Sequence, residues 1–277
     1  HRVSRRQRQM CIRDSILRLF QSLGEFNRVL SMSISTYVHL ENLLKIEENK
    51  ETIYSSNFQI EDSIKERKNA VEIKNVNFKY LNSDNLIFKD LNIEIKKNKH
   101  TIITGPNGVG KSTFLGLVSG VFYPVEGEVN LFTNKVSYVS AYPMIIKGTL
   151  KENILYGTEK NKASDKEIKN LISKFELFKN NNNNLEIKVS NRTLSSGQMQ
   201  KLSFIRALLS NPELLLLDES TANLDKKTKK LIYKILKELN ITILNSTHAS
   251  DDLEDFDFEL SFSSIDGSTL ITESENK

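Results

Sequence analysis

The 277-residue sequence has a single cysteine, Cys11, and it lacks any unbroken run of about 18 apolar residues. A lone cysteine excludes disulfide bonds within the body of the chain and any cysteine-based metal site, which fits a reducing cytosol. The missing apolar run excludes a segment that spans a bilayer unaided, and no secretory signal is visible.

An excess of one charge is also missing from most of the chain. The formal net charge is +4, but residues 1–15 alone contain five arginines and one aspartate. The remaining residues carry 34 basic and 34 acidic side chains. The body of the protein therefore gives no electrostatic reason to expect nucleic-acid binding.

Residues 1–15 are rich in arginine, whereas the rest of the chain prefers lysine. They show no apolar periodicity, do not begin with methionine and resemble translated sequencing-adapter read-through. We interpret them as a non-native leader and leave them out of the fold prediction. A basic arm that binds membrane or nucleic acid is the alternative.

The rest of the chain divides into a helix, a linker and a large domain. Apolar residues recur at helical spacing through residues 16–48, and charged residues within this stretch argue against a membrane span. The helix either packs on the domain or is the cytosolic end of a last transmembrane helix, and we predict the latter. Residues 49–69 are polar without a clear period, so we predict a linker, with the domain at 70–277.

The domain has the pattern of an α/β fold, because strand-like segments alternate with helical ones. Residues 71–98 predict an antiparallel β layer, and residues 214–218 and 241–248 are apolar runs typical of buried parallel strands. Residues 145–205 predict a mainly helical insertion. Hydrophobic residues make up 38% of the chain, enough for a sizeable core.

Gly105–Ser112 has the sequence GPNGVGKS, which matches the phosphate-binding P-loop pattern GxxxxGK[ST]. Glycines allow backbone N–H groups to surround phosphate oxygens, and the following helix directs its positive N-terminus at the same anion. We expect Lys111 to reach the β- and γ-phosphates and the Ser112 hydroxyl to bind Mg²⁺. A strand at 100–104 and a helix at 112–118 supply the required context.

Asp218 and Glu219 directly follow the apolar run 214–217. A carboxylate at the end of a buried strand beside a P-loop can hold the Mg²⁺ shell, so we assign Asp218 to the metal. The next carboxylate can polarise the attacking water, so we assign Glu219 as general base.

Residues 194–198 have the sequence LSSGQ, and here the chain resembles the ATP-binding domains of ABC transporters, whose signature is LSGGQ. Tyr80 matches the family's adenine-stacking aromatic, residues 222–225 match its D-loop, and His248 matches its switch histidine. The ordered motifs cover about residues 71–265. Singly, each has an ordinary structural explanation; Ser195, for example, is a preferred helix N-cap.

The resemblance implies a P-loop NTPase core with a parallel sheet, an antiparallel β subdomain and a helical signature subdomain. It adds His248 to Lys111 and Glu219 as catalytic residues, and it keeps Ser112 and Asp218 on the metal. The residues that it places on ATP are Tyr80, Gly105, Pro106, Asn107, Gly108, Val109, Gly110, Lys111, Ser112, Thr113, Ser195, Ser196, Gly197, Gln198 and Asp225.

The family also implies partners. Two such domains meet head to tail, so Ser195 and Gly197 of one would act on ATP bound to the other. Closure of the pair would drive a transmembrane domain of the same full-length chain, upstream of Ile16, and hydrolysis would reset it. The ATPase domain would then lie on the cytoplasmic side of a cell membrane.

Two residues depart from the family pattern. Ala141 occupies the position of a glutamine that contacts Mg²⁺ and water in the family, which puts coupling or hydrolysis rate in doubt; Ser140 is at best a partial substitute. Ser196 replaces a glycine of the signature, a milder change because Gly197 is kept.

Residues 146–157, IKGTLKENILYG, are similar to a stretch of exporter-type ATPases, so we predict an exporter. A soluble importer subunit and a low-activity half of a heterodimeric exporter remain alternatives. A chromosome-organising ATPase would need a long coiled coil between P-loop and signature, but Lys111 and Leu194 are only 83 residues apart and show no sustained heptads.

Overall fold

The computed structural model divides the chain into two units, residues 1–55 and 56–277. It describes residues 18–19, 22–27, 29–30, 57–61, 67–81, 83–157, 163–178, 184–222, 224–247, 256–265 and 268–276. In the first unit the described residues are helical, and Leu19, Leu23, Phe26 and Leu30 are exposed. No helix among the described residues is both long and apolar enough to cross a membrane. Residues 1–15 and 31–48 lie outside the described ranges, so the predictions for them stay untested.

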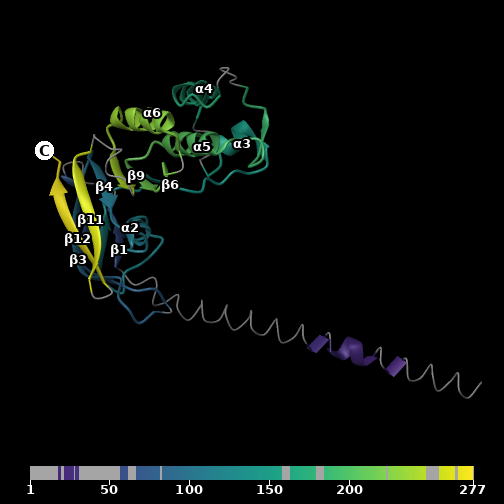
Figure 1. Cartoon of the computed structure of the whole chain (residues 1–277), viewed down its shortest axis with the longest axis horizontal. Coiled ribbons are helices and arrows are strands. Elements are labelled where there is room, and N and C mark those ends of the chain that lie inside the picture. Colours follow the sequence, from purple (N-terminus) through teal and green to yellow (C-terminus); the bar gives the residue numbers. More distant parts are fainter. Residues whose placement is uncertain are drawn as a thin grey trace, which may run out of the picture. The chain divides into compact units, whose positions relative to one another are not determined.

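A six-stranded sheet forms the centre of the second unit (Figure 1). Its strand order is β12 (Ser268–Glu275), β11 (Phe258–Ile265), β4 (His100–Thr104), β10 (Thr242–Ser246), β9 (Leu214–Asp218) and β6 (Val136–Ser140). All neighbours pair in parallel except β12, which forms an antiparallel hairpin with β11. This arrangement confirms the predicted α/β fold with a parallel sheet.

The predicted antiparallel layer is a second sheet, in the order β1 (Phe58–Ile60), β5 (Glu126–Leu131), β2 (Asn69–Phe78) and β3 (Phe88–Lys96). Strands β2, β3 and β5 pair antiparallel, and β1 adds to β5 in parallel. Strand β1 lies inside the stretch predicted as linker. Its short sequence carries no period-two signal strong enough to reveal a partner some 70 residues away.

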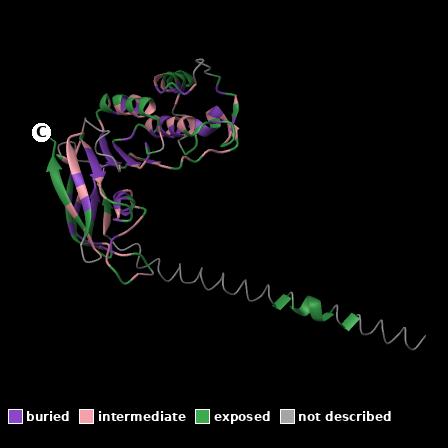
Figure 2. Cartoon of the chain, viewed as in Figure 1, coloured by how far each residue is buried: buried purple, intermediate pink, exposed green. Residues whose placement is uncertain are grey.

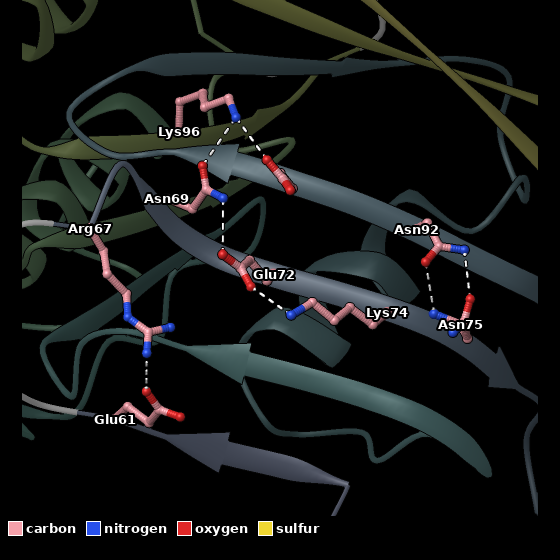
Figure 3. Close-up of polar contacts among 9 residues, drawn as sticks. Glu61, Arg67, Asn69, Glu72, Lys74, Asn75, Asn92 and Lys96 are labelled. Atoms are coloured by element: carbon pink, nitrogen blue, oxygen red, sulfur yellow. Dashed lines mark hydrogen bonds and ion pairs between the residues drawn. The ribbon is translucent and has the colours of Figure 1, made fainter. Parts of the chain in front are cut away.

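Polar side chains tie this layer together at its surface (Figure 3). Asn69 links β2 to β3, because its amide donates to Glu72 at 3.0 Å and its oxygen accepts from Lys96 at 3.1 Å. Arg67 pairs with Glu61 at 2.7 Å and so connects the residues next to β1 and β2. Such exposed ion pairs add little stability, on the order of 1 kcal/mol or less each.

The helical insertion is built from short helices between β6 and β9. They are α3 (Leu150–Ile154), α4 (Asp165–Lys174) and α5 (Ser196–Leu209), with a small β7–β8 ladder (Gly148–Thr149 and Lys188–Val189). Each helix begins with a capping box, in which a Ser or Thr side chain accepts the N3 amide and a Glu or Gln reaches back. Helix α6 (Lys226–Lys237) follows β9.

The middle strands β4, β10 and β9 of the central sheet are buried, whereas the edge strand β12 is largely exposed (Figure 2). In β9, Leu214 and Leu216 pack with the antiparallel layer and α2 (Lys111–Val118), whereas Leu215 and Leu217 pack with the helical insertion and α6. All four leucines are fully buried, which explains the unbroken apolar run in the sequence. Side chains that follow β9 are thereby fixed at the edge where the P-loop lies.

Candidate active site

The P-loop connects β4 to α2, as its motif predicts. Gly105 has φ +136°, and a Cβ at this position would meet the carbonyl oxygen of Phe262 in β11. Gly110 has φ +105° and is the N-cap residue of α2. Both positions need a backbone conformation that residues with a side chain rarely adopt. The glycines therefore let the loop turn tightly beside the sheet.

The N-terminus of α2 is suited to bind an anion. Among the described residues no side chain caps it, and its first turn contains no acidic residue. Its free N–H groups and the helix dipole thus favour a phosphate. Lys111 is a buried residue, and its Nζ donates to the carbonyl oxygens of Gly105 at 2.8 Å and Pro106 at 2.9 Å. Burial lowers the pKa of Lys111, and the charges of Glu219 and Asp218 oppose that shift.

A pocket of about 300 Å³ opens over this helix end. Its lining residues are Tyr80, Ile87, Gly108, Val109, Gly110, Lys111, Ser112, Thr113, Glu219, Ser264 and Thr269. The structure thus brings most of the predicted P-loop residues together with Tyr80 and Glu219. Gly105, Pro106 and Asn107 form the first half of the loop and are not among the lining residues.

Tyr80 forms one wall of the pocket and is held from three sides. Its ring makes edge contacts with Phe78 at 5.3 Å and Phe122 at 5.5 Å between centroids. Its hydroxyl is 2.8 Å from the Oγ1 of Thr113 in α2. The side chain is still 43% exposed, so part of the ring faces the pocket. This is a fixed aromatic surface on which a base can stack.

Asp218 ends β9 and lies directly beside the P-loop. The Ser112 hydroxyl donates to its Oδ1 at 2.9 Å, and the Tyr138 hydroxyl donates to its Oδ2 at 2.8 Å. Burial and, to a lesser extent, the bond to Asp218 raise the pKa of Tyr138, so its hydroxyl stays protonated and acts as the donor. No sequence motif points to Tyr138, because its contact with Asp218 depends on the pairing of β6 with β9, and the two residues are 80 positions apart.

Ser112 and Asp218 fit the magnesium site predicted for them. A hydroxyl and a carboxylate within 2.9 Å of each other are the oxygen donors that Mg²⁺ prefers. Magnesium in nucleotide sites relies on one or two carboxylates plus phosphate oxygens and water. Accordingly, no cluster of three or more His, Cys, Asp or Glu side chains is needed, and none occurs among the described residues.

Glu219 follows Asp218 in an uncommon backbone conformation, with φ +48°. Its N–H donates to the Ser246 carbonyl at 3.1 Å, and its own carbonyl accepts from Ala222 at 3.1 Å. These bonds at the ends of β9 and β10 hold a non-glycine residue in the left-handed region, a feature that concentrates at functional sites. The side chain consequently lines the pocket.

The β11–β12 hairpin contributes pocket residues that the sequence analysis missed. Ser264 and Thr269 line the pocket, and the Thr269 hydroxyl donates to the Val109 carbonyl in the P-loop at 2.6 Å. Neither residue belongs to a recognisable motif. Their position depends on β11 pairing with β4, which only the fold reveals.

The signature residues are not part of this pocket. Ser195 is the N-cap of α5. Its hydroxyl accepts a hydrogen bond from the backbone N–H of Gln198 at 3.2 Å, and the Gln198 side-chain oxygen accepts one from the backbone N–H of Ser195 at 2.9 Å. Ser195 and Ser196 are exposed, and the nearest atom to a Cβ built on Gly197 is 4.0 Å away, in Leu224. This helix end is therefore open to solvent in the single chain.

Asp225, predicted to contact nucleotide, is the N-cap of α6 and is also not among the lining residues. Its two carboxylate oxygens accept from the Thr228 amide at 3.0 Å and the Thr228 hydroxyl at 2.8 Å. These bonds lower the pKa of Asp225. His248 lies outside the described residues, so its catalytic role stays a prediction.

Comparisons with known proteins agree with this geometry. The family model "ABC transporter" matches residues 88–222. The nickel import system ATP-binding protein NikE of Staphylococcus aureus is 36% identical, over 63% of this chain and 76% of NikE. The ATP-dependent permease MDL1 of Candida albicans is 33% identical, over 68% of this chain and 30% of the permease.

A solved structure of a bacterial Atm1-family ABC exporter with ATP bound shares the fold, with a TM-score of 0.67 and 22% identity. The match covers 85% of this chain and 44% of that one. The present chain thus spans less than half the length of the MDL1 permease and of the Atm1-family exporter chain.

The fold and the pocket define a P-loop nucleotide-binding domain. The chain belongs to the ABC transporter family, in which it is an ATP-binding domain.

Proposed function

We propose that this chain binds ATP with Mg²⁺, hydrolyses it within a head-to-tail dimer of ATPase domains, and couples hydrolysis to export by a transmembrane domain of the same full-length protein. The observation that carries the proposal is the pocket in which Tyr80, the P-loop and Glu219 meet. The likeness to the MDL1 permease supports the exporter assignment.

Each part of the pocket has a task in this proposal. The adenine stacks on Tyr80, and the phosphates bind to the loop amides, the α2 N-terminus and Lys111. Ser112 and Asp218 hold the magnesium ion, which when bound neutralises charge on the phosphates. Glu219 accepts a proton from the attacking water. His248, predicted to contact the γ-phosphate, completes the set.

The open signature helix supports the dimer. Ser195, Gly197 and Gln198 lie at a helix N-terminus that faces no nucleotide of its own chain. Exposed hydroxyl and backbone donors at such an end suit a γ-phosphate supplied by a second domain. The transporter would then be a membrane protein with this domain on the cytoplasmic side.

Mg²⁺-dependent ATP turnover by the purified chain tests the proposal, beside Glu219→Gln and with dimerisation followed by light scattering. We expect turnover that Glu219→Gln lowers by roughly 100-fold or more, together with an ATP-trapped dimer. Glu213→Gln is a matched control, because Glu213 lies at the other end of β9 and pairs with Lys135 on the surface.

A second function, the low-activity half of a heterodimer, is favoured by Ala141, whose methyl group offers no ligand. The hydroxyl of neighbouring Ser140 donates to the Tyr142 carbonyl at 2.9 Å, so it is held within its own loop. ATP binding without turnover in the unmutated chain would support this second function. A third, an importer subunit like NikE, would be indicated if the chain joined a separate membrane subunit.

A further inference from the structure

The face of the central sheet that α2 covers carries one tyrosine whose position is fixed by strand pairing. Strand β6 pairs with β9 in parallel, with Tyr138 opposite Leu216 and Ser140 opposite Asp218. Val139, between them, packs into the core on the helical side. Tyr138 therefore shares a face with Asp218, and its long side chain extends along the strand to the carboxylate.

Both oxygens of the Asp218 carboxylate are consequently engaged by a hydroxyl. Ser112 approaches Oδ1 from α2, and Tyr138 approaches Oδ2 from β6. The two donors come from different elements and each bonds a different oxygen, so together they restrict rotation of the carboxylate about the χ2 angle. A carboxylate held in this way is oriented before any ligand arrives.

We propose that Tyr138 is a positioning residue that orients Asp218 for the metal of the nucleotide complex. The proposal rests on the proposed function, since it assumes that Asp218 serves a metal. With magnesium bound, Ser112 and Asp218 would both serve the metal, and the Tyr138 hydroxyl would still be available as a donor to Oδ2. Outer hydrogen-bond partners of this kind commonly control how tightly a metal is held.

The neighbourhood of Tyr138 makes this role more important in this chain. Ala141 cannot hydrogen-bond through its side chain, and the Ser140 hydroxyl is bonded to Tyr142. The side-chain amide of the buried Gln200 donates to the Ser140 carbonyl at 3.0 Å rather than to Asp218. Within residues 136–142, Tyr138 is thus the side chain for which the structure gives a hydrogen bond to Asp218.

Titration of the full chain with Mn²⁺, followed by electron paramagnetic resonance in the presence of ATPγS, tests the proposal. We expect Tyr138→Phe to weaken Mn²⁺ binding by on the order of tenfold. Affinity for ATPγS in EDTA should stay the same, because Tyr138 does not line the nucleotide pocket. Tyr142→Phe is the matched control: Tyr142 is 86% exposed, and its substitution should change neither affinity.

The outcomes separate the possible roles. Equal Mn²⁺ affinity in Tyr138→Phe and the unmutated chain would overturn the proposal and leave the proposed function intact. A parallel loss of ATPγS affinity in EDTA and of thermal stability would show that Tyr138 is merely structural, and would also overturn it. An unmutated chain that binds neither ATPγS nor Mn²⁺ would refute the proposed function itself.

Discussion

The nucleotide pocket and the signature segment of this chain differ in how complete they are. In the pocket, residues from β4, α2, β9 and the β11–β12 hairpin converge and bond to one another: Ser112 to Asp218, and Thr269 to Val109. In the signature segment, Ser195 and Gln198 form hydrogen bonds with each other that cap their own helix. The Gln198 side chain also donates to the carbonyl of Leu177 in the same chain. One region can hold a ligand alone, whereas the other offers donors to solvent.

This difference separates binding from turnover. The residues of the pocket lie together in a single chain, whereas in the proposed function the signature donors act on a nucleotide bound to a second domain. Variants in the pocket should therefore weaken nucleotide binding, and variants in the signature segment should lower turnover without weakening binding. A signature variant that also weakens binding would contradict this separation.

Among variants that compare the two regions, the largest effect is expected from Ser195→Ala, which should lower ATP turnover on the order of 100-fold by removing a γ-phosphate donor. Nucleotide affinity of the single chain should be unchanged. Both Ser195 and Ser164 cap helices through a capping box, so Ser164→Ala is a matched control. Each should reduce the free energy of unfolding by about 1 kcal/mol, but only Ser195→Ala should lower phosphate release. Equal turnover in the two variants would mean that Ser195 is only a cap.

Lys111→Ala should act on binding instead. The buried ammonium group would no longer be available to phosphate, so we expect ATP affinity to fall by about 10- to 100-fold in calorimetric titrations. Lys135→Ala, which breaks a surface pair with Glu213, should leave affinity unchanged. Retained affinity in Lys111→Ala would show that the loop amides and the helix end suffice to bind the phosphates.

Tyr80→Ala sharpens the comparison within the pocket. Loss of the aromatic surface should weaken ATP binding by about tenfold, in line with the value of base stacking on an aromatic ring. Affinity for tripolyphosphate, which has no base, should not change. If both ligands weaken equally, the Tyr80 hydroxyl contact with Thr113 matters more than the ring, and Tyr80→Phe should then reproduce the loss.

The smallest effect is expected at the hydrogen bond between α5 and β6. Gln200 in α5 donates to the Ser140 carbonyl at the end of β6, and Gln200→Leu would leave that carbonyl without its partner. We expect a loss of about 1 kcal/mol in the free energy of unfolding, measured by urea denaturation, with ATP affinity unchanged. Ser137→Ala, which removes the hydroxyl contact with the other end of α5, is the comparison variant.

Local patterns predicted the parts of the fold whose signal lies within a few residues. The apolar run before Asp218 and the GKS motif identified β9, β4 and α2, because burial on both faces and phosphate binding each demand a characteristic composition. The same applies to α5, where Ser195 is of a residue type preferred as a helix N-cap and occupies that position in the structure.

Features that depend on register between distant segments could not be predicted in this way. Strand β1 lies within the predicted linker, because its own three residues do not indicate that it pairs with β5. The contact of Tyr138 with Asp218 requires the alignment of β6 with β9, and that of Thr269 with Val109 requires the hairpin beside β4. Each is a long-range consequence of the sheet order.

The sheet order also bears on how the domain is made. Strand β4, which leads into the P-loop, pairs with β10 and β11, both synthesised more than 130 residues later. On the ribosome the GPNGVGKS segment is made before either strand neighbour, and the second neighbour is complete only when residue 265 has been translated. Nucleotide would thus be unable to assist the nascent domain until its final hairpin forms, and the late closure of such distant contacts predicts slow folding.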